Sequence, residues 1–132
     1  MRHLSFSALL LATLILPSCV PLVAGAGVGY IVSQQVLPNN VHETQVAIDV
    51  DRVWPSVKET LGFFQDPGTE LALQDFPRTI HAKVDGAKVL VEVEAHDIEL
   101  TTIRVSAEKY LAKDNSTAAE VMKGILERLG KL

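Results

Sequence analysis

Cysteine and positive charge are both scarce in this chain. The 132 residues include one cysteine, Cys19, and 12 Lys and Arg against 16 Asp and Glu, for a formal net charge of −4. A single thiol excludes an internal disulfide and a zinc site built from several cysteines. Because nucleic-acid binding depends on neutralising phosphates with a basic surface, the acidic balance argues against a nucleic-acid partner. The same balance leaves apolar insertion or covalent lipid as the means of attaching to a membrane.

Charge is absent altogether from a long segment near the start. No charged residue occurs from Leu4 to Val32, and the opening MRH is followed by the run LSFSALLLATLIL at residues 4–16. A positive start, about 7–15 apolar residues and a small residue before the cleavage point are typical of a secretory signal. The run is shorter than the roughly 20 residues that span a bilayer, and Pro17 and Pro21 would break a longer helix. We therefore expect residues 1–18 to be a signal peptide.

The residues that close this segment resemble a lipobox, the motif that precedes lipid attachment in bacterial lipoproteins. They are Leu16-Pro17-Ser18-Cys19. In such a motif Leu16 fills an apolar peptidase pocket, Ser18 leaves the scissile bond accessible, and the Cys19 thiol forms the thioether to diacylglycerol. We expect cleavage between Ser18 and Cys19 and lipid on Cys19, with a plain secretory signal or a retained helical anchor as the alternatives. By the same resemblance, Val20 in place of Asp implies transport to the outer membrane, facing the periplasm.

Residues 19–44 are expected to form a lipidated tether and a linker. Gly25, Gly27 and Gly29 lie in the apolar run after Cys19, but their spacing does not match a dinucleotide-binding or phosphate-binding loop. Two interpretations remain: a flexible tether close to the lipid surface, or a segment whose small residues promote self-association or membrane insertion. Gln34 to Thr44, which includes Pro-Asn-Asn, is predicted to be a polar linker.

Residues 45–132 predict one compact α+β domain with the element order β-α-β-β-β-β-α. Alternation of apolar and polar residues predicts strands, and apolar residues at helical spacing predict two helices. The strands are expected at 45–50, 70–75, 79–84, 87–96 and 101–107, and the helices at 50–64 and 116–129. Asp85-Gly86 predicts a two-residue turn that pairs Val84 with Ala87. Because one sheet face is apolar, we expect a two-layer sandwich, mainly antiparallel, with both helices on that face.

Several segments together resemble a family of small bacterial lipoproteins known only as a domain of unknown function. They are the lipobox, the run VAGAGVGY, the strand and helix AIDVDRVWPSVKETL, the hairpin, and the strand TTIRVSA. The resemblance covers nearly the whole mature chain. It implies a lipid-anchored envelope protein with a small α+β domain, and it implies no activity.

Polar residues of the kind used in catalysis do not form a recognisable constellation. His42 is expected in the linker, and His81 and His96 are placed about 20 Å apart along the hairpin, too far to share a metal ion. Glu92 and Glu94 are expected on a flat, solvated strand face, which does not suit a catalytic pair of carboxylates. We therefore expect no catalytic residue, no metal ligand and no cofactor.

Two further side chains have a structural and a binding interpretation. Trp54 falls in the apolar stripe of the first helix, which favours core packing over ligand stacking. Arg104 on the open sheet face is expected either to meet a partner's carboxylate or to pair with a neighbouring glutamate across strands. The leading hypothesis is a non-enzymatic, membrane-anchored envelope lipoprotein whose polar sheet face or edge strand binds an unknown envelope protein. The alternative is a carrier or sensor of a small apolar ligand held between the helices and the sheet, in a cavity near Trp54, Phe63 or Phe64.

Overall fold

The computed structural model describes residues 28–132. The expected signal peptide, its cleavage site, Cys19, Gly25 and Gly27 lie outside these residues, whereas Gly29 lies in a short 3₁₀ helix that leads into the sheet. None of the helices in the described part of the chain is long and apolar enough to cross a membrane.

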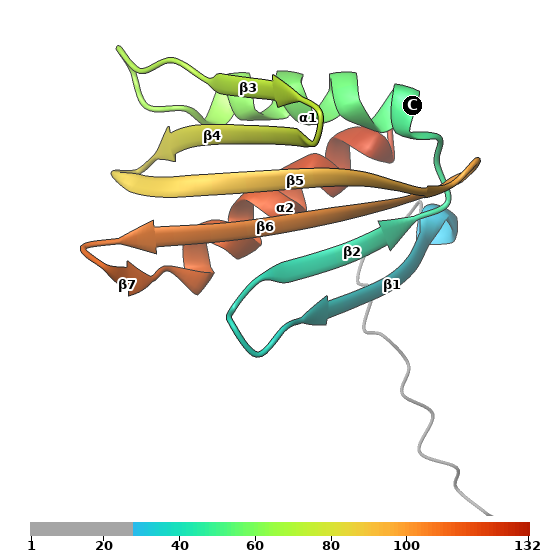
Figure 1. The fold of residues 1–132 in the computed structure, drawn as a ribbon, viewed down its shortest axis with the longest axis horizontal. Helices are drawn as coiled ribbons and strands as arrows, with labels where there is room; N and C mark the ends of the chain where they lie inside the picture. Colours follow the sequence, from blue (N-terminus) through green and yellow to red (C-terminus); the bar gives the residue numbers. More distant parts are fainter. Residues whose placement is uncertain (1–27) are drawn as a thin grey trace, which may run out of the picture.

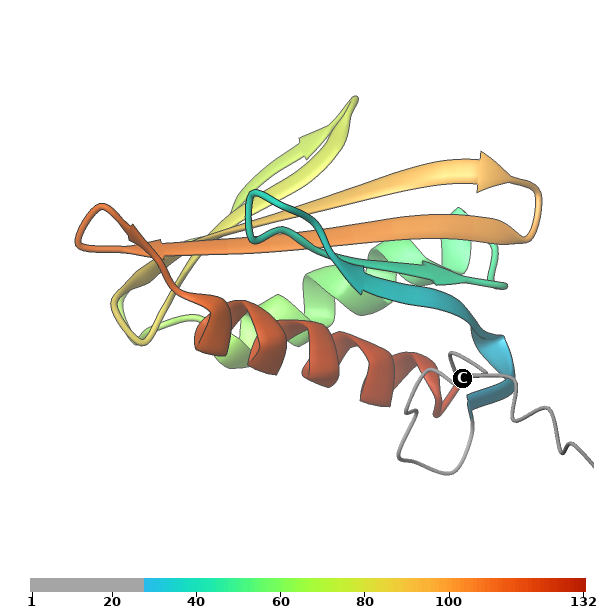
Figure 2. The same ribbon diagram turned by 90° about the horizontal axis from the view of Figure 1, so that it is seen from below.

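An antiparallel seven-stranded sheet carries two α-helices on one face (Figures 1 and 2). The elements are η1 (Val28–Tyr30), β1 (Ile31–Val36), β2 (His42–Val46), α1 (Val50–Phe64), β3 (Ala72–Asp75), β4 (Arg78–Val84), β5 (Ala87–Asp97), β6 (Leu100–Lys109), β7 (Ala112–Lys113) and α2 (Asn115–Leu129). The strand order is β1-β2-β6-β5-β4-β3, and β7 pairs with β6. The expected α+β sandwich, with both helices on the apolar face, is confirmed.

Each helix begins at an aspartate and buries one stripe against the sheet. The Asp49 carboxylate accepts a hydrogen bond from the Asp51 amide at 2.7 Å, and the Asp114 carboxylate accepts one from the Thr117 amide at 3.1 Å. Such caps satisfy amides that have no partner within the helix. Trp54 is buried in the stripe of α1, so its predicted core position is confirmed.

The hairpin β4–β5 has the predicted register. Val84 lies opposite Ala87 across the turn, and both side chains are buried. Asp85 and Gly86 have φ of 49° and 77°, as a type I′ turn requires. The Asp66 carboxylate accepts hydrogen bonds from both turn amides, at 2.7 and 2.9 Å. These bonds fix the turn to the segment that follows α1.

The prediction of a linker at Gln34 to Thr44 is wrong, because this segment forms most of the hairpin β1–β2. The Leu37 amide donates to the Val41 carbonyl at 2.8 Å, and Asn40 has a φ of 62°. The Pro-Asn-Asn sequence is therefore the turn of a hairpin. β2 lies between β1 and β6, so the sheet begins at Ile31 rather than at Gln45. With β7 also added, the order is β-β-α-β-β-β-β-β-α.

Candidate interaction surface

A chain of polar contacts crosses the open face of the sheet, opposite the helices. Arg104 on β6 donates from Nε to a Glu43 oxygen on β2 at 2.8 Å and from Nη1 to a Glu94 oxygen on β5 at 2.9 Å. Gln35 on β1 donates to the other Glu43 oxygen at 2.8 Å. Glu43 and Arg104 are direct cross-strand partners, so the strand register itself produces this arrangement. One guanidinium thus joins carboxylates from the strands on both sides of it.

The two carboxylates around Arg104 differ in their contact with water. The Glu43 side chain is 12% exposed and that of Glu94 is 61% exposed, with Arg104 between them at 32%. The hydrogen bond from Gln35 is the main cause of a lowered pKa at Glu43, and the bonds from Arg104 add to it. Bonds to Glu94 and then to Glu43 raise the pKa of Arg104. Both shifts favour the charged forms at neutral pH, so the charges of this network are fixed.

The sequence predicted one of the two ion pairs of Arg104 and missed the other. The cross-strand pairing of Arg104 with a neighbouring glutamate is confirmed in Glu94. Glu43 was missed, because its strand was assigned to a linker. The one available signal was the alternation of His42, Thr44 and Val46 with Glu43 and Gln45, a period-two pattern of five residues.

A depression of about 450 Å³ lies beside Arg104 on the open face. It is lined by Asp75, Phe76, Pro77, Arg78, Thr79, Glu92, Val93, Glu94, Ala95 and Arg104. Phe76 is largely exposed at the turn between β3 and β4. Within residues 28–132, Arg78 pairs with Asp51 at 3.8 Å, and no ion pair involves Asp75 or Glu92. The depression therefore combines an exposed aromatic ring with two carboxylates, Asp75 and Glu92, that form no ion pair within the described residues, although Arg78 and Arg104 lie on the neighbouring strands.

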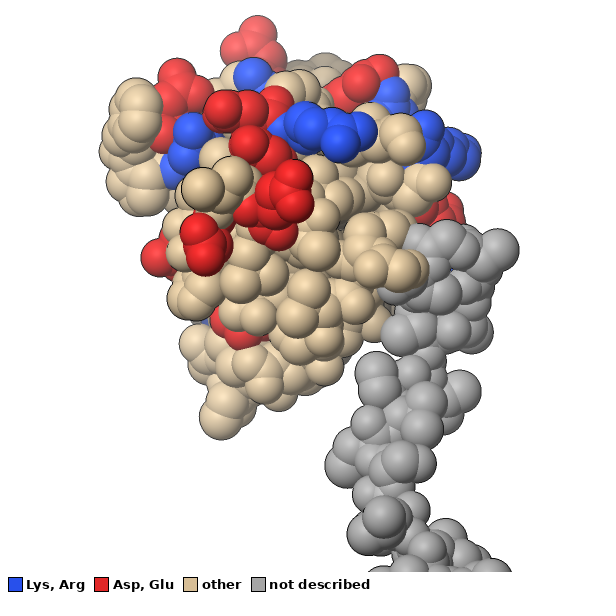
Figure 3. Space-filling view, turned by 90° about the vertical axis from the view of Figure 1, so that its right-hand side faces the viewer, with Lys and Arg blue, Asp and Glu red and all other residues tan. Residues whose placement is uncertain are grey.

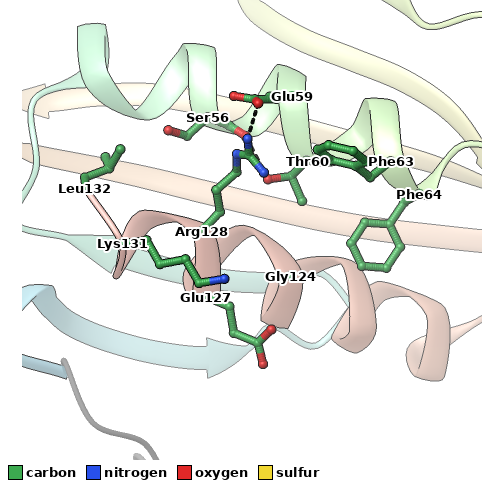
Figure 4. Close-up of a pocket in the computed structure, with 10 residues that line it drawn as sticks. All are labelled: Ser56, Glu59, Thr60, Phe63, Phe64, Gly124, Glu127, Arg128, Lys131 and Leu132. Carbon is green, nitrogen blue, oxygen red and sulfur yellow. Dashed lines mark hydrogen bonds and ion pairs between the residues drawn. The ribbon is translucent and has the colours of Figure 1, made fainter.

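A second depression, of about 460 Å³, lies between α1 and α2 on the side away from the sheet (Figure 4). Arg128 forms an ion pair with Glu59, and its guanidinium carbon is 5.3 Å from the centroid of the Phe63 ring. The Phe64 ring lies against Gly124, where an added Cβ would be 2.4 Å from the ring. The hollow near Phe63 and Phe64 thus opens on the outer surface, not between helices and sheet where the apolar-ligand hypothesis requires it.

The histidines occupy separate places. His42 begins β2, where its Nε2 atom is buried without a hydrogen-bond partner, and His81 lies opposite Leu90 in the β4–β5 register. His96 is exposed near the end of β5. Within residues 28–132, no three His, Cys, Asp or Glu side chains are grouped in a way that could hold a metal ion.

Charged side chains are unevenly distributed over the molecule. Figure 3 shows Asp and Glu gathered in the upper part of the view, and an almost uncharged lower part. The hairpin β1–β2 lies at the lower edge of the sheet in Figure 1, and residues 31–41 include no Lys, Arg, Asp or Glu. On the face seen in Figure 3, charged side chains of both signs thus lie mostly in the upper part, and residues 31–41 of the β1–β2 hairpin contribute no Lys, Arg, Asp or Glu.

Comparison with family models, with curated proteins and with solved structures finds no match for this chain. The family resemblance drawn from the sequence motifs is therefore an expectation, and the surfaces described above are the basis for a functional proposal.

Proposed function

We propose that this chain is a lipid-anchored binding module of the bacterial envelope, joined to the membrane through Cys19 and acting by binding another envelope protein rather than by catalysis. The lipobox Leu16-Pro17-Ser18-Cys19 supports the anchor. Two or three acyl chains hold a protein at a bilayer, because each buried methylene contributes about 0.8 kcal/mol. The residue after the cysteine, Val20, supports the outer membrane as its place.

The depression beside Arg104 is the proposed binding site, and one observation carries this choice. Arg104 hydrogen-bonds to Glu43 and Glu94, and within residues 28–132 it forms no ion pair with Glu92, its direct partner on β5. Glu92 lines the same depression as the exposed Phe76, and no ion pair within residues 28–132 involves it. An apolar ring beside a free carboxylate suits a partner that presents a Lys or Arg side chain next to apolar surface.

The hydrogen bonds around Arg104 also support specific binding, because they hold the charged side chains in place. The charged groups of this network are held by hydrogen bonds across strands before any partner arrives. A preorganised surface loses less side-chain entropy on binding than a mobile one. A carrier of a small apolar ligand has less support, because the hollow beside Phe63 also contains Glu59, Glu127 and Arg128.

Charge reversal in the depression tests this proposal. Membranes from cells that express the wild-type chain or Glu92→Lys are treated with a short amine-reactive or carboxyl-activating cross-linker, and the products are identified by mass. We expect one cross-linked partner with the wild type and its loss with Glu92→Lys. Glu120→Lys makes the same charge change on the exposed side of α2 and serves as the control. Equal cross-linking by Glu92→Lys and Glu120→Lys would reject this site.

A further inference from the structure

Within residues 28–132, the two edges of the sheet differ in how they are protected. Native sheets guard their edges with charged residues, proline or short strands, because free backbone groups there can pair with another chain. β3 is such a guarded edge, since it has four residues and ends at Asp75. β1 has six residues with no charge and no proline, and within residues 28–132 it pairs with β2 alone. Its register irregularity, between Ile31 and Ser33, leaves residues 33–36 in regular pairing. Val32 and Val36 on this strand are 54% and 57% exposed.

The hydrogen-bond pattern shows which backbone groups of β1 point away from the sheet. Leu37 and Val41 form a hydrogen-bonded pair at the end of the β1–β2 hairpin. In an antiparallel ladder, bonded and non-bonded pairs alternate. Gln35, opposite Glu43, therefore bonds to β2, whereas Gln34 and Val36 turn their N–H and C=O groups outward.

These outward groups are self-complementary. When two β1 strands lie antiparallel with Gln35 opposite Gln35, Gln34 of each copy faces Val36 of the other. Each of these two pairs exchanges an N–H···O=C bond in both directions, which makes four bonds between the copies. The arrangement is a two-fold, isologous contact, in which the same surface serves both partners.

The distribution of charge favours this edge for contact between two copies of the chain. Two copies of a chain with a net charge of −4 repel each other over most of their surface. Residues 31–41 are uncharged, and the lower part of the molecule in Figure 3 is nearly free of charge. An approach along β1 therefore brings no like charges of the strand together.

We propose that β1 is a self-association surface through which two copies of this chain join their sheets into one continuous antiparallel sheet. The contact leaves the open-face depression and the helix layer of each copy free. Gln35 at the centre of the contact also hydrogen-bonds to Glu43, so the contact adjoins the Arg104 network but does not include the residues that line the depression.

Disulfide trapping tests this contact in the full-length chain. Gln35→Cys places two thiols at a non-hydrogen-bonded pair, where Cα atoms are about 4.5 Å apart and within the range for a disulfide. Gln74→Cys is the matched control on β3, the opposite edge. The wild type, whose one cysteine is Cys19, gives the baseline. After mild oxidation of membranes, we expect a reducible dimer with Gln35→Cys and only the baseline amount with Gln74→Cys.

Added charge separates a specific contact from random collision. In the Gln35→Cys chain, Gln34→Lys should abolish the disulfide-linked dimer, whereas Gln74→Lys should leave it unchanged. Gln34 is exposed, so thermal unfolding followed by circular dichroism should show that both lysine variants stay folded. The proposal is overturned if Gln35→Cys gives no more dimer than Gln74→Cys. A dimer that persists with Gln34→Lys, or a disulfide-linked product whose mass requires another protein, also overturns it.

Discussion

Arg104 should be coupled strongly to Glu43 and weakly to Glu94, and a double-mutant cycle can measure both couplings. The N···O distances are nearly equal, at 2.8 and 2.9 Å, so distance alone predicts equal couplings. Exposure distinguishes the pairs, because the Glu43 side chain is 12% exposed and the Glu94 side chain 61%. Exposed ion pairs contribute about 0.2–1 kcal/mol, and hydrogen bonds to charged groups with less water access about 1.5–3 kcal/mol. We expect a coupling of about 1.5 kcal/mol with Glu43 and below about 0.5 kcal/mol with Glu94.

The cycle uses Arg104→Met, which keeps much of the apolar stem, with Glu43→Gln and Glu94→Gln. Trp54 is the single tryptophan and is buried, so its fluorescence reports unfolding in urea at neutral pH and low salt. Arg104→Met alone should lower the free energy of unfolding by about 2 kcal/mol, because it leaves the mostly buried Glu43 carboxylate without its cation. Equal couplings, or a Glu43 coupling near zero, would refute the idea that exposure decides the strength of these pairs.

Three further outcomes are expected. Gly124→Ala should lower the free energy of unfolding by about 1 kcal/mol, because the added Cβ meets the aromatic ring beside it, whereas Gly62→Ala, with open space around it, should raise it by about 0.5–1 kcal/mol. Tyr110→Asn with Leu111→Gly should raise it by about 1 kcal/mol, because both residues have positive φ, at 52° and 63°, in a turn that favours Asn-Gly; an unchanged urea midpoint would contradict this. The lowered pKa of Glu43 means that its contribution is complete above the ordinary value of about 4.3 and is lost as the pH falls through the folded-state pKa. Urea unfolding between pH 6 and 3 should therefore show a steeper acid loss for the wild type than for Glu43→Gln.

The predictable part of the fold is the part with two independent sequence signals. In the hairpin β4–β5, the turn pair Asp85-Gly86 and the alternation of buried residues indicate the same register, and a slip by one residue would move the buried side chains to the wrong face. The first helix likewise combines an aspartate cap with an apolar stripe. In both elements the turn or cap and the pattern of buried residues favour the same arrangement, so the local prediction matches the tertiary structure.

The first hairpin was missed because its signals conflict. β1 is an edge strand whose residues are mostly exposed, so it has little reason to alternate strictly. Its turn contains Pro38-Asn39-Asn40, a sequence equally typical of a linker. The turn before β7 is formed by Tyr110 and Leu111, both with positive φ. Neither is Gly, Asn or Asp, the residues that usually occupy such positions, so nothing in the sequence indicates this turn. Because the first hairpin was missed, Glu43 and its contact with Arg104 were not predicted either.

The mass of the protein isolated from membranes tests the central claim most directly. If Cys19 anchors the chain, the wild type should have lost residues 1–18 and gained the mass of a diacylglyceryl group and any further acyl chain. Cys19→Ala should show neither the acyl mass nor this cleavage. A wild-type chain that is recovered from the soluble fraction with an unmodified thiol, or that retains its first eighteen residues, would contradict the account.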